Sequence, residues 1–150
     1  MEYEILLHNL NNTQKEIGTD KGLAKIGDSI VNLIYSVAKS MYLTKINKNA
    51  AIIRTGDKVN KTILSQALKD AEMKDFAKNR GDSHDLANTV EAIVAYIWLS
   101  RKSTISEMIG IIYENLSGDI TKRRMENENA SLAFAELLKI FKPFLPTKKI

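Results

Sequence analysis

Two acidic residues, Asp28 and Glu91, each take a place in an apolar stripe of a predicted helix. The stripe around Asp28 continues with Val31 and Tyr35, and the stripe around Glu91 continues with Val94. Residues at this spacing share one helix face, so both acids are expected near the core. An ionised carboxylate there is costly unless it is paired, hydrogen-bonded or bound to a metal.

Two such acids on different helices could hold a divalent cation between them. A bound cation lowers the pKa of a coordinated water and polarises a phosphoryl group. The alternative is that each acid is a structural carboxylate, satisfied by a lysine, an arginine or a hydroxyl group. The residues around Asp28 and Glu91 leave both interpretations open at this point.

The helix that carries Asp28 is predicted over residues 23–43, with Thr19 or Asp20 as its N-terminal cap. It has two adjacent apolar stripes, which indicates packing on more than one side and a central place in the fold. Gly27 directly precedes the acid and costs about 1 kcal/mol relative to alanine inside a helix. This glycine therefore indicates a close approach of another backbone or of a ligand.

The helix that carries Glu91 is predicted over residues 86–99, with Asp85 as its cap. It also has two neighbouring apolar stripes. Asn88 lies three residues before Glu91, close enough to share its helix face. The two acid-bearing helices are therefore predicted to pack together with their carboxylates facing each other.

The remaining elements are also predicted to be helices, because no useful stretch alternates apolar and polar residues. The sequence predicts an all-α fold in one domain over residues 1–150. The predicted segments are a short helix within 2–16, a basic helix or turn over 44–58, a helix over 58–73 capped by Asp57, a polar loop over 75–85, a helix over 104–116, a connector over 118–129, and an added C-terminal helix over 128–142.

Composition excludes several classes of chemistry. The chain of 150 residues has no cysteine, which excludes disulfides and thiolate catalysis. Its two histidines are far apart, so a metal site would use mainly oxygen ligands, which favours Mg²⁺ or Mn²⁺ over zinc. No apolar run approaches the roughly 18 residues of a membrane span, and the N-terminus does not resemble a signal peptide. A cytoplasmic protein without a membrane partner is expected.

The 22 basic residues exceed the 18 acidic ones, giving a net charge of +4. The excess is uneven, and it gathers around residues 45–61, 78–80 and 122–124. Such runs either keep a face solvated or bind a polyanion.

Two motifs resemble one known family. Residues 23–28, Leu-Ala-Lys-Ile-Gly-Asp, resemble the ribonuclease III signature, commonly Leu-Glu-Phe-Leu-Gly-Asp. Residues 88–96, Asn-Thr-Val-Glu-Ala-Ile-Val-Ala-Tyr, resemble that family's Asp-Thr-Phe-Glu-Ala-Leu-Ile-Gly-Ala. Residues 58–65 lie between them, where the family has a basic helix bearing valine and serine. The resemblance covers about residues 22–116 and identifies a ribonuclease III endonuclease-like helical domain.

The chain departs from the family pattern at two of its four acids. Ala24 stands in place of the first motif's glutamate, and Asn88 stands in place of the second motif's aspartate. The Mini-III branch is similar in lacking that glutamate and in lacking a double-stranded-RNA-binding domain. The chain is therefore similar to Mini-III and to archaeal ribonuclease-III-like proteins, and its smaller acid set implies weaker metal binding or a changed metal preference.

The resemblance implies hydrolysis of phosphodiester bonds in double-stranded RNA, with Mg²⁺ or Mn²⁺, by a homodimer with a shared basic valley. Asp28 and Glu91 would be catalytic metal ligands, and Asn88 could assist as a third ligand. Double-stranded RNA is recognised largely through its shape, phosphates and 2′-hydroxyls, which suits flexible cations. The candidate RNA contacts are Lys45, Lys48, Arg54, Lys58, Lys78, Arg80 and His84. For His84 an ordinary loop histidine is the alternative.

Two other functions remain open from the sequence. A non-catalytic RNA-binding or dimerisation module with the ribonuclease III fold is favoured by Ala24 and Asn88, whereas Asp28 and Glu91 favour an enzyme. An all-α nucleotide pyrophosphohydrolase would also use helix-borne acids with Mg²⁺. Those enzymes usually present Glu-x-x-Glu pairs, and no such pair stands on an apolar helix here.

Overall fold

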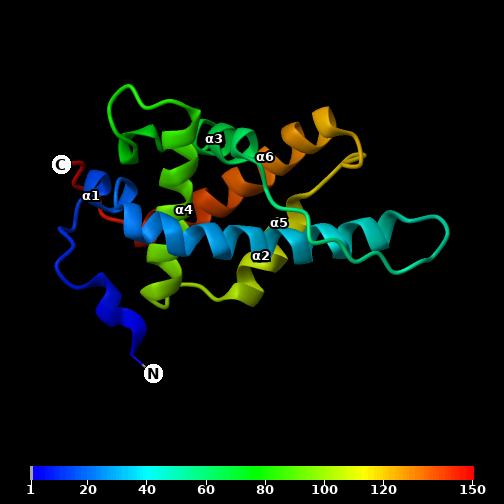
Figure 1. The fold of residues 1–150 in the computed structure, drawn as a ribbon, viewed down its shortest axis with the longest axis horizontal. Helices are drawn as coiled ribbons and strands as arrows, with labels where there is room; N and C mark the ends of the chain where they lie inside the picture. The colour runs from blue at the N-terminus through cyan, green and yellow to red at the C-terminus, as the bar shows by residue number, and fades with distance from the viewer. Residues whose placement is uncertain (1) are drawn as a thin grey trace.

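Helix α2 runs through the middle of the molecule in the computed structural model, which describes residues 2–150 (Figure 1). It spans Lys21–Ile46 and packs against both α4 and α5. The described residues form helices and no strand, so the predicted all-α fold is confirmed. The other α-helices are α1 (Gln14–Gly18), α3 (Lys61–Asp70), α4 (Ser83–Leu99), α5 (Ile105–Asn115) and α6 (Arg123–Phe141), and the 3₁₀ helices are η1 (Tyr3–Leu7), η2 (Lys74–Phe76) and η3 (Lys142–Phe144).

The central place of α2 follows from its two apolar stripes. Ile30 and Ile34 from one stripe and Val31 and Tyr35 from the other are all buried. The side chain of Asp20 accepts a hydrogen bond from the Leu23 amide at 2.8 Å, so Asp20 is the cap. The helix continues three residues beyond the predicted end at residue 43.

Helix α4 begins earlier than predicted. Asp82 is its cap, and its side chain accepts a hydrogen bond from the Asp85 amide at 2.9 Å. The Asp82 amide in turn donates to the Asp85 carboxylate at 3.0 Å. The prediction that Asp85 is the cap is therefore wrong, because Asp85 forms the second half of a capping box.

Other predicted boundaries also need correction. Of the helix or turn predicted over 44–58, the structure has the end of α2 and then a turn followed by irregular chain to residue 60. Helix α3 starts only at Lys61, capped by Asn60 and not by Asp57. Residues 2–16 hold η1 and the start of a separate α1 instead of one short helix. Residues 75–85 include part of η2 and the first turn of α4.

The C-terminal helix α6 is longer than predicted and belongs to the core. It begins at Arg123, so half of the expected connector is helical. Its buried residues include Phe134, Leu138 and Phe141, and it packs against α3 and α5.

A network of charged and hydroxyl groups around the buried Lys39 joins the first turn of α6 to α2. The Lys39 ammonium donates to the carboxylates of Glu126 at 2.7 Å and Asp57 at 2.8 Å, and the Tyr35 hydroxyl hydrogen-bonds to Glu126. Burial disfavours the charged form of Lys39, but its two carboxylate partners outweigh this and raise its pKa. Burial and the Glu126 hydrogen bond also raise the pKa of Tyr35. We call Tyr35, Lys39, Asp57 and Glu126 the lysine cluster.

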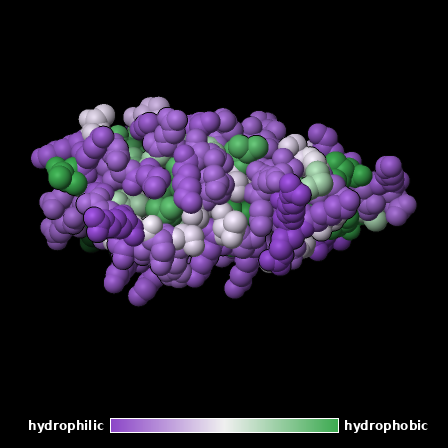
Figure 2. Space-filling model, turned by 90° about the horizontal axis from the view of Figure 1, so that it is seen from above, coloured by the Kyte–Doolittle hydropathy of each residue, from purple (hydrophilic) through white to green (hydrophobic). Residues whose placement is uncertain are grey.

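The surface seen in Figure 2 is mostly hydrophilic, with small separate hydrophobic areas. Between residues 2 and 150, no helix combines the length and the apolar character needed to cross a lipid bilayer.

Candidate active site

The site forms where α2 and α4 cross with their backbones almost in contact. A Cβ atom built on Gly27 would lie 1.8 Å from the carbonyl oxygen of Glu91, which is far inside van der Waals distance. Only glycine permits this approach, so the predicted close contact of another backbone at Gly27 is confirmed. The approach places the neighbouring Asp28 beside Glu91.

The carboxyl groups of Asp28 and Glu91 lie close enough for Asp28 to influence the protonation of Glu91. Asp28 is exposed to the solvent, whereas Glu91 is only 9% exposed. Burial raises the pKa of Glu91 to about 8, the hydrogen bond and negative charge of Asp28 act in the same direction, and the charge of Lys61 opposes them. Burial first, and the neighbouring acid second, therefore favour the protonated form of Glu91 in the metal-free protein.

A cleft of about 780 Å³ opens above this pair, between α2, α3 and α4. Asp28, Asn88 and Glu91 all line it, so the structure brings together the three residues predicted as metal ligands. The rest of the lining is rich in cations, which are Lys21, Lys25, Lys58, Lys61 and Lys78. A cleft with acids among lysines has the charge pattern that a divalent cation and a phosphate backbone would together satisfy.

The predicted RNA-contacting residues divide between this cleft and other parts of the surface. Lys58, Lys78 and His84 line the cleft. Lys45 and Arg54 line a separate, more apolar hollow of about 600 Å³ beside the second half of α2. Lys48 and Arg80 are exposed and line neither hollow.

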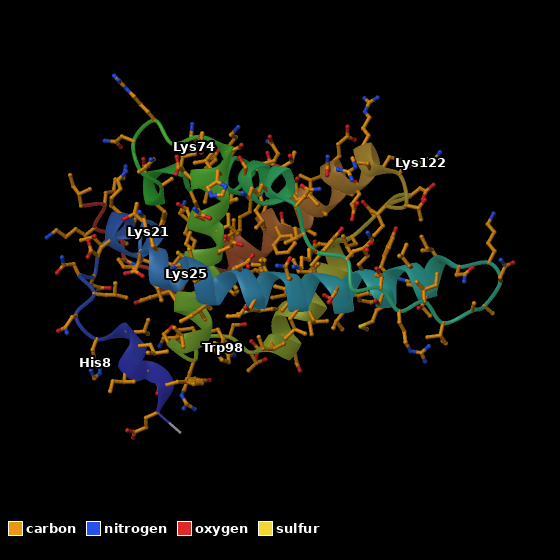
Figure 3. All side chains as sticks on the ribbon, viewed as in Figure 1. His8, Lys21, Lys25, Lys74, Trp98 and Lys122 are labelled. Carbon is orange, nitrogen blue, oxygen red and sulfur yellow. The ribbon has the colours of Figure 1, made fainter. Side chains whose placement is uncertain are left out.

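The cleft also contains cations that the sequence analysis did not select. Lys21 and Lys25 project from the first turns of α2 (Figure 3), and Lys61 starts α3. Lys61 contacts His84 through its ammonium group. The spacing of Lys25, three residues before Asp28, could have identified it, because residues three apart share a helix face.

Hydrogen bonds of helix α1 connect it to α4 and to the loop that carries Lys78. The Thr89 hydroxyl donates to the Gly18 carbonyl at 2.8 Å, two residues away from Glu91 along α4. The Lys15 ammonium donates to the Ala77 carbonyl at 2.6 Å and to the Asn79 side chain at 3.1 Å. These bonds hold the residues on both sides of Lys78.

The donor set of the pair fits a hydrated magnesium ion. Within residues 2–150 no group of three or more histidine, aspartate or glutamate side chains is placed to hold a metal. The pair offers two carboxylates, and Asn88 adds an amide oxygen in the same cleft. Magnesium commonly takes one or two carboxylates and keeps several waters, so this small oxygen set suits it and does not suit zinc.

Comparison with known protein families gives a match over most of the chain, including Asp28, Asn88 and Glu91. Residues 21–145 match the family model described as Ribonuclease III. The match includes α2, the cleft and α6, so it extends beyond the resemblance over residues 22–116. No curated protein sequence matches the chain. The chain belongs to the ribonuclease III family.

Proposed function

We propose that this member of the ribonuclease III family is a metal-dependent endoribonuclease that cleaves phosphodiester bonds in double-stranded RNA. The observation that carries the proposal is the acid pair of the exposed Asp28 and the buried Glu91 in a lysine-lined cleft. A carboxylate buried beside a second acid opposes folding, so the retention of Glu91 next to Asp28 favours a working site over a structural one.

In this proposal Asp28 and Glu91 hold the metal through carboxylate oxygens, and Asn88 contributes its amide oxygen or orients a coordinated water. The bound cation would supply an acidic water and polarise the scissile phosphate. Lys58 and Lys78 at the rim would contact phosphates on either side of the cleavage position. The close backbone contact between Gly27 and Glu91 places Asp28, the next residue on α2, beside Glu91.

A homodimer is part of the proposal. The face of α2 that does not pack against α4 or α5 exposes Leu33 and Met41 by 49% and 46%, and Ile52 next to it is 63% exposed. Met41 and Ile52 line the same hollow, and exposed apolar side chains of this kind are common where another protein binds. A second copy on this face would place two clefts along one duplex, one for each strand.

A non-catalytic duplex-binding module is the second candidate. Ala24 and Asn88 favour it, because both line the cleft without adding the charge of a carboxylate. Such a module would use the same lysines but would not need the acid pair.

The test is incubation of the purified protein with a long RNA duplex and Mg²⁺ or Mn²⁺, beside Asp28→Asn and Glu91→Gln. Glu136→Gln is the matched control, because Glu136 is a glutamate on α6 that pairs with Lys139 outside the cleft. Cleavage by the wild type and by the control, lost in both site variants, supports the enzyme. Duplex binding without cleavage in either metal supports the module instead, and no binding at all rejects both.

A further inference from the structure

The side-chain amide of Asn32, in the cleft, forms hydrogen bonds through both its NH₂ group and its oxygen. It lies one helical turn after Asp28 on α2. Its NH₂ group donates to the Asp28 carboxylate at 3.3 Å and to the Asp28 carbonyl at 2.9 Å. Its oxygen accepts a hydrogen bond from the backbone amide of Val59 at 3.0 Å.

These partners fix the orientation of the amide. A backbone N–H can only donate, so the oxygen of Asn32 must face Val59 and the NH₂ group must face Asp28. An aspartate at this position would turn a carboxylate toward Asp28, and a leucine would serve neither neighbour. Asparagine therefore combines a donor for the acid with an acceptor for the chain segment opposite.

The segment opposite is the chain between α2 and α3 that carries Lys58. Residues 55–60 have no regular secondary structure, so hydrogen bonds determine their course. The Thr55 amide is held by the Ser40 hydroxyl at 2.9 Å, and Asn60 caps α3. The Lys39 ammonium holds Asp57 on one side of Lys58, and the Val59 amide bond to Asn32 holds the other side. Both contacts join this segment to α2, and the second also connects it to Asp28.

We propose that Asn32 is a positioning residue that fixes the Asp28 carboxylate and the Lys58 segment relative to each other. Through one side chain, the group that would hold the metal and the cation that would contact RNA keep a constant separation. The inference rests on the proposed function for the roles of Asp28 and Lys58, while the hydrogen bonds of Asn32 stand independently of it.

The test uses Asn32→Leu, which keeps the side-chain size and removes all three hydrogen bonds, with Asn32→Ala as the second variant should leucine prevent folding. Asn115→Leu is the matched control. Asn115 is an exposed asparagine whose NH₂ group donates to the Ile111 carbonyl at 2.8 Å, the same bond to the residue four positions earlier that Asn32 makes to Asp28. It lies at the end of α5, outside the lining of the cleft.

Three readouts separate positioning from general stability. Electron paramagnetic resonance of free Mn²⁺ measures metal affinity without RNA, steady-state cleavage separates KM from kcat, and amide exchange reports on Val59. We expect Asn32→Leu to weaken Mn²⁺ binding about tenfold, the usual scale for losing a partner of a metal ligand. We also expect a higher KM for the duplex and faster exchange of the Val59 amide, with no such changes in Asn115→Leu.

A double variant tests the connection to Lys58. If Asn32 acts on RNA binding through this lysine, the KM of Asn32→Leu with Lys58→Met will be close to that of Lys58→Met alone. The inference would be overturned if the double variant showed the product of the two single-variant effects on KM. An unchanged Mn²⁺ affinity in a folded Asn32→Leu protein would also overturn it. Should the wild type leave duplexes intact while Asn32→Leu still loses Mn²⁺ affinity and Val59 protection, the proposed function fails and the positioning role stands.

Discussion

Helix α2 contributes to two charged groups, about three helical turns apart, that each contain a buried ionisable side chain and are opposite in character. At one end, Asp28 meets Glu91, an acid against an acid, and burial raises the pKa of Glu91 to about 8. Further along, Lys39 in the lysine cluster meets two carboxylates, and its pKa is raised because these partners stabilise its charge. Both groups join α2 to another part of the chain, but only the lysine cluster contains charges of opposite sign.

The difference separates a structural role from a functional one. Removing one partner from a compensated buried ion pair leaves a charge without a counter-charge, so the lysine cluster is expected to stabilise the fold as it stands. The acid pair is expected to destabilise the metal-free fold, because its two members repel when both are ionised. Substitutions in the two places should therefore have opposite signs for stability.

The largest expected effect is on catalysis. Glu91→Gln should lower the single-turnover rate of duplex cleavage by at least about 1,000-fold, since it removes a charged metal ligand where the transition state develops charge. Duplex affinity should stay nearly unchanged, because the surrounding lysines remain. Rates at saturating protein measure this, and a loss of tenfold or less would show that Glu91 does not hold a catalytic metal.

The second effect concerns the stability of the lysine cluster. Lys39→Met should lower the free energy of unfolding by about 3 kcal/mol, because Glu126 and Asp57 then face each other without the lysine. Lys139→Met is the control, since Lys139 pairs with Glu136 at the surface and should change stability by only about 0.5 kcal/mol. Urea denaturation compares the two, and equal losses would contradict the buried network.

The third effect is a stabilisation at the acid pair. In metal-free protein at pH 8, Glu91→Gln should be more stable than the wild type by roughly 2 kcal/mol. The folded pKa of Glu91 lies above its ordinary value of 4.5, so the folded state binds the proton more tightly than the unfolded state does. The wild type therefore loses stability as the pH rises from 4.5 toward 8, while the glutamine variant does not. Unfolding curves at several pH values measure the difference, and a difference independent of pH would contradict the raised pKa.

The smallest effect concerns the loss of folding stability at alkaline pH. Tyr35→Phe should cost about 1 kcal/mol at pH 7, because the hydrogen bond to Glu126 is lost. The raised pKa of Tyr35 means that the unfolded chain ionises first above pH 10, so the wild type loses stability there. The phenylalanine variant should lose less stability between pH 9.5 and 11. If the stability of the two proteins changed with pH in the same way, the ionisation of Tyr35 would not cause the loss of stability at high pH.

The sequence alone was sufficient to identify the acidic residues at the centre of the candidate site. An acid inside an apolar stripe is visible without coordinates, and it selected Asp28 and Glu91, while the helix spacing added Asn88. Gly27 also signalled the close crossing of α2 and α4. These features depend on positions within one helix, which a repeating pattern records.

The surroundings of the site depended on contacts that no local pattern records. Lys45 and Arg54 lie at another hollow because residues 47–60 follow α2 back along its length as extended chain, held by bonds such as Thr55 to Ser40. The first turns of α6 are polar and show no apolar stripe, and Glu126 there is held by the buried lysine cluster. Asn32 appears in the sequence only as one more polar helix residue.

The most direct test of the central claim is thermal unfolding with and without Mg²⁺. If the acid pair binds a cation in the folded state only, Mg²⁺ at ten times its Kd should stabilise the wild type by about 1.4 kcal/mol and raise its Tm. Lys39→Met should gain as much, because its acid pair is intact, whereas Asp28→Asn and Glu91→Gln should gain little. An equal gain in all four proteins, or none in the wild type, would contradict the claim that Asp28 and Glu91 form a cation site.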